Sequence, residues 1–220
     1  MSRPDPILIL TNANVLTANG EFEPGWVRVE ADQIVETGQG DGAGDTAAAG
    51  KIVDCTGQWL VPGYLDMHVH GGGGGSFTTG DQDEARQVAQ FHRGHGTTAM
   101  IASLVTAPIP ELVKAIESLA ELVESGELAG LHLEGPYLSR ARCGAHNPAY
   151  LRKPDLDEAT QLIEAGRGTI KMITIAPELP GATELIRHCV AAGVVVAVGH
   201  TDATYNETRA ALAAGARVAT

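Results

Sequence analysis

Hydrophobic and polar positions change rhythm near residue 60. Before it, short apolar stretches alternate with polar residues and turn signals recur every few positions, which predicts strands and no helices. Residues 26–30 alternate with a period of two, a tight turn is predicted at 32–33, and residues 34–35 begin the returning strand of a hairpin. The stretch 38–50 is rich in Gly, Ala and Asp and is predicted to be a mobile surface loop.

From residue 60 onward, predicted strands alternate with predicted helices. The strands cover residues 65–70, 97–104, 128–135, 170–177, 194–200 and 216–220. The helices cover residues 81–93, 110–125, 155–165, 181–192 and 204–214. Strands separated by helices pair in parallel, so this is an α/β pattern, either a doubly wound sheet or part of a barrel. The glycine run 71–75 does not open a helix as a dinucleotide-binding motif would, and is interpreted as a flexible loop over a site.

Composition narrows the class of protein. The chain has 220 residues, of which 44% are hydrophobic and 19% charged, as in a soluble globular protein. Its 15 basic and 27 acidic residues give a net charge of −12, which argues against a nucleic-acid or anionic-membrane surface. Apolar runs are shorter than the ~20 residues of a membrane-spanning helix. No secretory signal is recognised, so a cytoplasmic protein is expected. The three scattered cysteines are expected to be reduced thiols.

Two histidines stand at the end of the first predicted parallel strand. Side chains two residues apart on a strand point to the same face, so the imidazoles of His68 and His70 converge. Asp66 lies one step earlier on that face, where its carboxylate is expected to orient a ring nitrogen. By itself, the H-x-H pattern fits a metal site and a pair of polar loop residues about equally well.

Two further strands end in residues that bind metals. Glu134 ends the third predicted strand and His200 the fifth, at the edge where barrel enzymes gather their catalytic groups. His132 shares a face with Glu134 but lies one layer deeper, which favours a buried supporting role. Nitrogen and carboxylate ligands in this mix suit zinc, iron or a similar divalent ion. Such an ion lowers the pKa of bound water from 15.7 to about 7, so the pattern indicates hydrolysis.

A basic segment follows Glu134. Arg140, Arg142 and His146 lie within residues 139–148, and in so acidic a chain their charge either meets an anionic substrate or belongs to a solvated loop. Asp202 is interpreted as a turn or capping residue that can also touch a metal or substrate. Surface or capping roles are expected for three other histidines: His92, His95 and His188.

Several segments together form a specific pattern that spans nearly the whole chain. They are residues 61–71, 132–138 followed by 144–148, 175–178 and 199–204. These segments resemble the N-acetylglucosamine-6-phosphate deacetylase family of the metal-dependent amidohydrolase superfamily. The resemblance implies a (β/α)8 TIM-like barrel, here incomplete with about six strands, in residues 62–220. It also implies that residues 1–61 are part of a small β-sandwich domain.

The resemblance further implies an activity and a site. The activity is hydrolysis of N-acetyl-D-glucosamine 6-phosphate to D-glucosamine 6-phosphate and acetate, with a homodimer as the full-length protein. Ala145 and His146 correspond to substrate-binding residues. The implied metal ligands are His68, His70, Glu134 and His200. Members with H-x-H can hold a second ion, so one or two divalent ions are expected, zinc first and iron or another divalent metal as alternatives.

The family pattern also extends past this sequence. The next metal histidine, in an H-[LF]-[FY]-N-A-M segment, is expected directly after Thr220, and the catalytic Asp further on. No residue of the chain is therefore assigned as the general acid or base. A typical eight-stranded barrel takes ~250 residues, which agrees with a partial barrel.

Two other interpretations stay open. One is a cyclic amide hydrolase of the dihydroorotase or hydantoinase type, which bridges two metals with a carboxylated lysine at the end of the fourth strand. In this sequence that strand ends in Ala176-Pro177-Glu178, and its lysine, Lys171, lies at the other end. The second interpretation is a catalytically silent fragment that binds a metal or associates with other chains.

Overall fold

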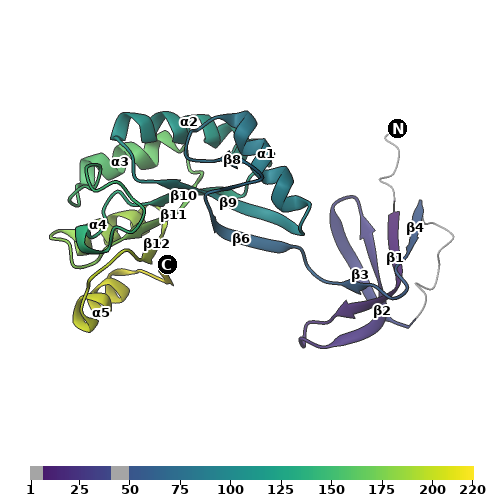
Figure 1. The fold of residues 1–220 in the computed structure, drawn as a ribbon. Helices are drawn as coiled ribbons and strands as arrows, with labels where there is room; N and C mark the ends of the chain where they lie inside the picture. The colour runs from purple at the N-terminus through teal and green to yellow at the C-terminus, as the bar shows by residue number, and fades with distance from the viewer. Residues whose placement is uncertain (1–6, 41–49) are drawn as a thin grey trace. The chain divides into compact units, whose positions relative to one another are not determined.

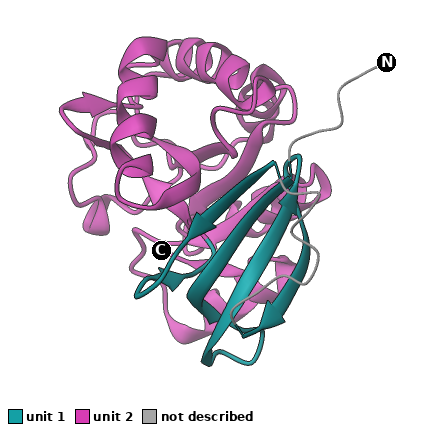
Figure 2. Ribbon diagram, turned by 90° about the vertical axis from the view of Figure 1, so that its right-hand side faces the viewer, with its two compact units in different colours: residues 1–62 teal, residues 63–220 magenta. Residues whose placement is uncertain are grey.

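A computed structural model describes residues 7–40 and 50–220 of the protein. Contacts divide the chain into two compact units, residues 1–62 and 63–220, shown in different colours in Figure 2. Most of the predicted loop at 38–50, namely residues 41–49, lies outside the described residues.

Unit 1 contains one mixed sheet, with both antiparallel and parallel strand pairs. Its strands are β1 (Ile7–Leu16), β2 (Phe22–Glu30), β3 (Gln33–Gln39), β4 (Lys51–Asp54) and β5 (Trp59–Leu60). They lie in the order β3-β2-β1-β4, and β5 pairs with β1. The β1–β2 and β2–β3 pairs are antiparallel, and the β1–β4 and β1–β5 pairs are parallel. The predicted hairpin is β2–β3, but its turn begins one residue earlier than expected. Gln33 already pairs with Glu30, so the two-residue loop is Ala31-Asp32, with Ala31 at φ 53°.

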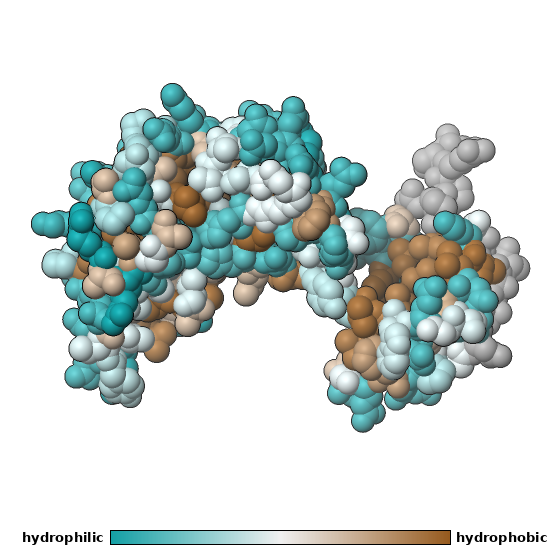
Figure 3. Space-filling view, in the orientation of Figure 1, coloured by the Kyte–Doolittle hydropathy of each residue, from teal (hydrophilic) through white to brown (hydrophobic). Residues whose placement is uncertain are grey.

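The described sheet of unit 1 forms one layer with apolar side chains still exposed. Ile9 and Trp26 form its small buried cluster. Phe22 and Trp59 are 44% and 64% exposed, and their rings meet edge to face with centroids 4.5 Å apart. Figure 3 shows hydrophobic atoms gathered on the surface of this unit. Such a surface is typical of a sheet that packs against a second layer, as in the predicted β-sandwich.

Unit 2 alternates strands and helices along the chain. The strands are β6 (Tyr64–Val69), β7 (Gly71–Gly72), β8 (Gly75–Ser76), β9 (Thr97–Val105), β10 (Gly130–Glu134), β11 (Ile170–Ile175), β12 (Val195–Val198) and β13 (Val218–Ala219). The helices are α1 (Gln82–Arg93), α2 (Ile109–Glu124), α3 (Leu156–Ala165), α4 (Ala182–Ala191) and α5 (Tyr205–Ala214), with a 3-10 turn, η2 (Arg140–Arg142). Each predicted helix and parallel strand is present, with ends that differ by a few residues.

Six strands of unit 2 form a curled parallel sheet in the order β13-β12-β11-β10-β9-β6 (Figure 1). The spatial order follows the chain order, so each helix returns the chain to the next position in the sheet. This arrangement confirms the partial β/α barrel and excludes the doubly wound alternative, in which the strand order reverses. The carboxyl ends of these strands all lie at one edge, and the candidate site lies there.

Three helices of unit 2, namely α1, α3 and α5, begin at a residue whose side chain caps them. Asp81 accepts the backbone N–H groups of Asp83 and Glu84 at the start of α1. Thr204 and Glu207 form a capping box at the start of α5. The helices then bury apolar faces against the sheet, and strand residues such as Leu131 are fully buried in the same core. Within the described residues, none of these helices is long and apolar enough to cross a membrane.

The glycine run 71–75 differs from its prediction. It forms the β7–β8 hairpin, which packs against α1 instead of lying as a loop over the site. Gln87 Nε2 donates to the Gly73 carbonyl at 2.7 Å. A Cβ atom on Gly72 would lie 2.5 Å from Nε2 of His92, and one on Gly73 would lie 2.9 Å from Phe91. Glycine is therefore needed here for close backbone packing.

Candidate metal centre

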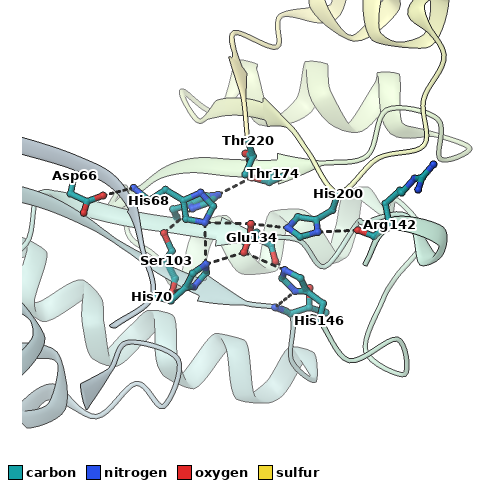
Figure 4. A network of polar contacts seen from close by, with 12 residues as sticks. Asp66, His68, His70, Ser103, Glu134, Arg142, His146, Thr174, His200 and Thr220 are labelled. Atoms are coloured by element: carbon teal, nitrogen blue, oxygen red, sulfur yellow. Dashed lines mark hydrogen bonds and ion pairs between the residues drawn. The ribbon is translucent and has the colours of Figure 1, made fainter. Parts of the chain in front are cut away.

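Glu134 lies at the end of β10 with four imidazoles around its carboxylate (Figure 4). His68 and His70 come from the end of β6, His146 from the loop after η2, and His200 from the residues just after β12. The structure therefore brings the four predicted ligands together and adds His146 to the cluster. Glu134 is only 5% exposed, so its charge is balanced by these neighbours and little by water.

Each carboxylate oxygen of Glu134 faces two ring nitrogens. Oε1 lies 3.3 Å from Nε2 of His68 and 2.9 Å from Nε2 of His200. Oε2 lies 2.9 Å from Nε2 of His70 and 3.2 Å from Nε2 of His146. Burial by itself would raise the pKa of Glu134, but hydrogen bonds with His146, His70 and His200 outweigh it and hold the pKa well below its usual range. Glu134 is therefore ionised at neutral pH.

Backbone carbonyls fix the tautomers of two of these histidines. His70 Nδ1–H donates to the Ser103 carbonyl at 2.9 Å, and His200 Nδ1–H donates to the Arg142 carbonyl at 3.0 Å. In each neutral ring, Nε2 then carries a lone pair directed at the carboxylate of Glu134. The Nε2 lone pair and the carboxylate oxygen are both acceptors, so their close approach is favourable only with a proton or a metal cation between them. The hydrogen bond with Glu134 accordingly raises the pKa of His70.

His146 has the opposite tautomer. The backbone N–H of Thr106 donates to His146 Nδ1 at 3.3 Å, which places the ring proton on Nε2. That N–H then donates to Oε2 of Glu134. In this state His146 is a hydrogen-bond donor to the carboxylate, whereas His70 and His200 present lone pairs.

His68 and His70 lie on the same face, as the H-x-H spacing predicts. Their Nε2 atoms are 3.0 Å apart and both face Glu134. The prediction for Asp66 was wrong: its carboxylate accepts the backbone N–H of His68 at 3.1 Å and contacts no ring nitrogen in the described structure. The cause is local, because a carboxylate at this position reaches the amide two residues on before it can reach an imidazole.

His132 lies beneath the cluster and is fully buried, as its deeper position predicts. Nδ1 pairs with the Ser103 hydroxyl and Nε2 with the Thr174 hydroxyl, each at 2.9 Å. Its ring also meets that of His68 edge to face at 4.7 Å. Burial, followed by the charge of His68, lowers the pKa of His132 to about 3, so the ring is neutral at physiological pH.

The donor set fits a divalent cation. His68, His70 and Glu134 offer ligand atoms within 4.8 Å of one another. The ligand atoms of Glu134, His146 and His200 also lie within 4.8 Å of one another, although the Nε2–H of His146 donates to the carboxylate in this structure. Glu134 belongs to both groups, so its two oxygens can serve neighbouring positions. Unprotonated imidazole nitrogens with a carboxylate are the ligands that zinc and iron bind in proteins. The cluster therefore indicates a divalent metal site.

An open depression of about 470 Å³ adjoins the cluster. It is lined by Glu134, three of the histidines and the predicted substrate residue Ala145, together with Asn147 and Tyr150. A small molecule in this depression would lie directly against the carboxylate and the ring nitrogens.

The basic segment after Glu134 contributes less free charge than its sequence suggests. Arg142 Nη2 pairs with the Asp202 carboxylate at 2.8 Å, so most of its charge is met within the chain. Arg140 is exposed and donates to the Pro148 carbonyl. Asp202 pairs with Arg142 and lies outside both groups of candidate ligands, and Thr204 caps α5 in its place.

Sequence reasoning missed the hydroxyl residues that support the cluster. They are Ser103, Thr106 and Thr174, all buried on or next to strands β9 and β11. The available signal was their position near the carboxyl ends of parallel strands, the same signal that found Glu134. Outer partners of this kind orient the imidazoles of metal sites.

Comparison with known proteins identifies the family to which the chain is similar. Residues 59–220 match the Amidohydrolase family. A point mutant of N-acetyl-D-glucosamine-6-phosphate deacetylase from Mycobacterium smegmatis, in complex with N-acetyl-D-glucosamine-6-phosphate, superposes with a TM-score of 0.88 at 44% identity. The alignment covers 97% of this chain and 55% of that one.

Curated relatives carry two related names. N-acetylglucosamine-6-phosphate deacetylase of Vibrio furnissii is 35% identical over 72% of this chain and 41% of its own length. N-acetylgalactosamine-6-phosphate deacetylase of Escherichia coli O157:H7 is 34% identical over 76% of this chain and 45% of its own length. The chain thus spans about half the length of the curated relatives it matches.

The curled parallel β/α sheet, with a histidine and carboxylate cluster at its carboxyl edge, agrees with this family match. The chain belongs to the amidohydrolase family.

Proposed function

We propose that this chain forms the metal-binding part of an enzyme that hydrolyses N-acetyl-D-glucosamine 6-phosphate to D-glucosamine 6-phosphate and acetate. The observation that carries the proposal is the Glu134 carboxylate, buried at the carboxyl edge of the sheet among four imidazoles. The 44% identity to the Mycobacterium smegmatis deacetylase over 97% of the chain supports this substrate.

Glu134 and His200 are the proposed main ligands, with His68 and His70 extending the set for a second ion. A divalent cation held there would lower the pKa of a bound water and polarise the amide carbonyl. Zinc is the proposed metal, because imidazole nitrogen with one carboxylate is a common catalytic zinc set. The chain's own contribution is to hold the lone pairs of His70 and His200 inward through the carbonyls of Ser103 and Arg142.

The depression beside the cluster is the proposed substrate site. Ala145 and His146 line it, and the Nε2–H of His146 points to the same carboxylate that the ligands share. With the Glu134 carboxylate bound to a metal ion, that N–H would be available to donate to an acetamide or sugar oxygen. Within residues 139–148, Arg140 is the basic side chain that is not paired with a carboxylate in the described structure, which makes it the candidate contact for a phosphate.

The relatives, about twice as long, support a proposal that the complete activity needs residues outside this chain, among them the general acid or base. Homodimerisation is part of the same proposal. A cytoplasmic location is supported by three free cysteines and by a phosphorylated substrate.

Acetate release provides the test of the reaction. The zinc-loaded chain and a full-length relative would be assayed with N-acetylglucosamine 6-phosphate, its galactosamine epimer, unphosphorylated N-acetylglucosamine and a cyclic amide. Acetate from the glucosamine phosphate supports the proposal. Ring opening of the cyclic amide would favour the rival hydrolase, although its bridging lysine is lacking: Lys171 lies at the opposite end of β11 and donates to the Gly168 carbonyl. Zinc binding without turnover by the chain alone is the result expected if residues outside it complete the active site, and the full-length relative then provides the acetate readout.

The H-x-H pair provides a separate prediction. A double variant, His68→Ala with His70→Ala, is expected to bind fewer metal ions per chain, because it removes two of the ligand atoms that meet Glu134. Elemental analysis after dialysis against zinc measures the stoichiometry. The matched control is His95→Ala with His188→Ala, which removes two imidazoles outside the cluster. Unchanged stoichiometry in the first variant would show that the pair is no ligand set.

A further inference from the structure

His200 has an unusual backbone conformation. Its φ angle is 47°, in the left-handed region that residues with a Cβ atom rarely adopt. Its ring nevertheless directs Nε2 at Oε1 of Glu134 from 2.9 Å (Figure 4). A backbone conformation of this kind persists only where the surrounding structure fixes it. The contacts of the residues next to His200, together with the hydrogen bond from its ring Nδ1–H to the Arg142 carbonyl, therefore direct its ring at the metal centre.

Glu178 makes two of these contacts. It follows β11, in the segment Ala176-Pro177-Glu178, and is half-buried. Oε1 accepts the backbone N–H of Asp202 at 2.8 Å, and Oε2 accepts the Thr201 hydroxyl at 2.5 Å. The Thr201 hydroxyl oxygen also accepts the N–H of Ala203 at 2.9 Å. One carboxylate thus holds the two residues directly after His200 and joins the loop after β11 to the loop after β12.

Two other contacts of the loop after β12 are a backbone hydrogen bond and an exposed ion pair. The His200 carbonyl accepts the N–H of Ser139 at 2.9 Å, which fixes the residue from the side of β10. Arg142 and Asp202 form an ion pair, but their side chains are 62% and 53% exposed. Exposed pairs of this kind contribute little, because water competes for both charges. Glu178 is therefore the side chain best placed to fix the turn after His200.

We propose that Glu178 is a positioning residue for His200. Its carboxylate fixes the turn 200–202 so that the imidazole of His200 presents Nε2 to the metal. The inference rests on the metal centre of the proposed function. In the described structure Glu178 makes no hydrogen bond or ion pair with the cluster itself, so it acts through Thr201 and Asp202. Losing an outer partner of a metal ligand typically lowers metal affinity 10–100-fold.

Three variants of the chain test the proposal. Glu178→Ala removes both acceptors. Glu178→Gln keeps one amide oxygen for the N–H of Asp202 and an amide N–H that can donate to Thr201. Glu184→Ala is the matched control, because it removes an exposed carboxylate from the first turn of α4. Zinc affinity is measured by competition with a chromophoric chelator, and the visible absorption of the cobalt(II)-loaded chain reports the ligand geometry.

Glu178→Ala is expected to weaken zinc binding by about 10–100-fold and to change the cobalt spectrum. Glu178→Gln is expected to recover most of the affinity, and Glu184→Ala to keep the original affinity and spectrum. Wild-type zinc affinity and an unchanged cobalt spectrum in Glu178→Ala would overturn the proposal.

A second measurement is independent of the metal. Amide hydrogen exchange of Asp202 is expected to be at least about tenfold faster in Glu178→Ala than in the unmutated chain or in Glu184→Ala, because its N–H loses its acceptor. Unchanged exchange would overturn the positioning role. Should the unmutated chain bind no zinc, the metal centre itself would be disproved, and the exchange rate would still decide whether Glu178 fixes the turn.

Discussion

Glu134→Gln is expected to lower the zinc affinity of the chain by about 100-fold or more, a larger loss than outer-partner substitutions produce. Glu134 is the carboxylate that touches all four imidazoles, and both candidate ligand groups include it. Glutamine keeps the shape but replaces one oxygen by an NH2 group and removes the negative charge. The number of zinc ions retained after dialysis, measured by elemental analysis, gives the result.

The matched control for this variant is Glu124→Gln. Glu124 lies at the end of α2, is 49% exposed at its side chain and pairs with Arg167, so the same chemical change there leaves the cluster intact. Circular dichroism of both variants establishes that the fold is retained. A Glu134→Gln chain with undiminished zinc would contradict the ligand assignment.

The metal-free chain offers an independent readout of Glu134→Gln. The hydrogen bond with Glu134 is the largest influence that raises the pKa of His70. Removing the carboxylate is therefore expected to lower the pKa of His70, which an NMR titration of the imidazole measures. This readout shows whether the contact exists even before any metal is added.

The second large effect expected is acid destabilisation caused by His132. Burial lowers the pKa of His132 to about 3, from an ordinary value of 6.5. Below pH 6.5, His132 is therefore protonated in the unfolded chain but stays neutral in the folded chain. Stability contributed by the neutral ring is fully present above pH 6.5 and falls as the pH drops toward 3. The slope is about 1.4 kcal/mol per pH unit, so the loss between pH 6.5 and 4.5 is about 2–3 kcal/mol.

The window from pH 6.5 to 4.5 separates His132 from its neighbours. Glu134 has a lowered pKa, so its contribution to stability is lost only below its ordinary value of 4.5. His70 has a raised pKa, so its contribution is fully present below pH 6.5 and is lost as the pH rises through the folded value. A decrease in stability on acidification within this window therefore has the sign of His132, because the contribution of His70 does not change below pH 6.5.

Urea unfolding of the metal-free chain at several pH values measures this slope. His132→Gln keeps a polar side chain between Ser103 and Thr174 but does not titrate, so the slope is expected to flatten. The same substitution at His188, which contacts Thr160 between α3 and α4, is the control and is expected to keep it. An equally steep slope in His132→Gln would assign the acid sensitivity to another group.

Local sequence patterns determined the elements of the fold. The spacing of apolar residues predicted all five helices, because one helix face must be buried whichever way the chain is arranged. The alternation of strands and helices predicted parallel pairing. What the pattern left open was sheet order: a doubly wound sheet and a partial barrel have the same local signals, and only long-range pairing separates them.

Strand periodicity predicted the part of the candidate site that comes from the ends of the strands. His68 and His70 converge because residues two apart share a face, and Glu134 and His200 follow because parallel strands end at one edge. The same rule predicted the wrong partner for Asp66: its short side chain accepts a backbone N–H and does not reach an imidazole. It also could not show that Arg142 would be paired with Asp202, sixty residues later in the chain.

By itself the sequence determined which candidate metal ligands the chain has and at which strand ends they stand. Tertiary structure decided how those residues are used: which ring nitrogen is free, which imidazole lies beneath the cluster, and that Glu178 reaches the turn beside His200. The reason is physical. Residue type and periodicity are local properties of the chain, whereas tautomer, burial and hydrogen-bond partner depend on groups that folding brings in from distant segments.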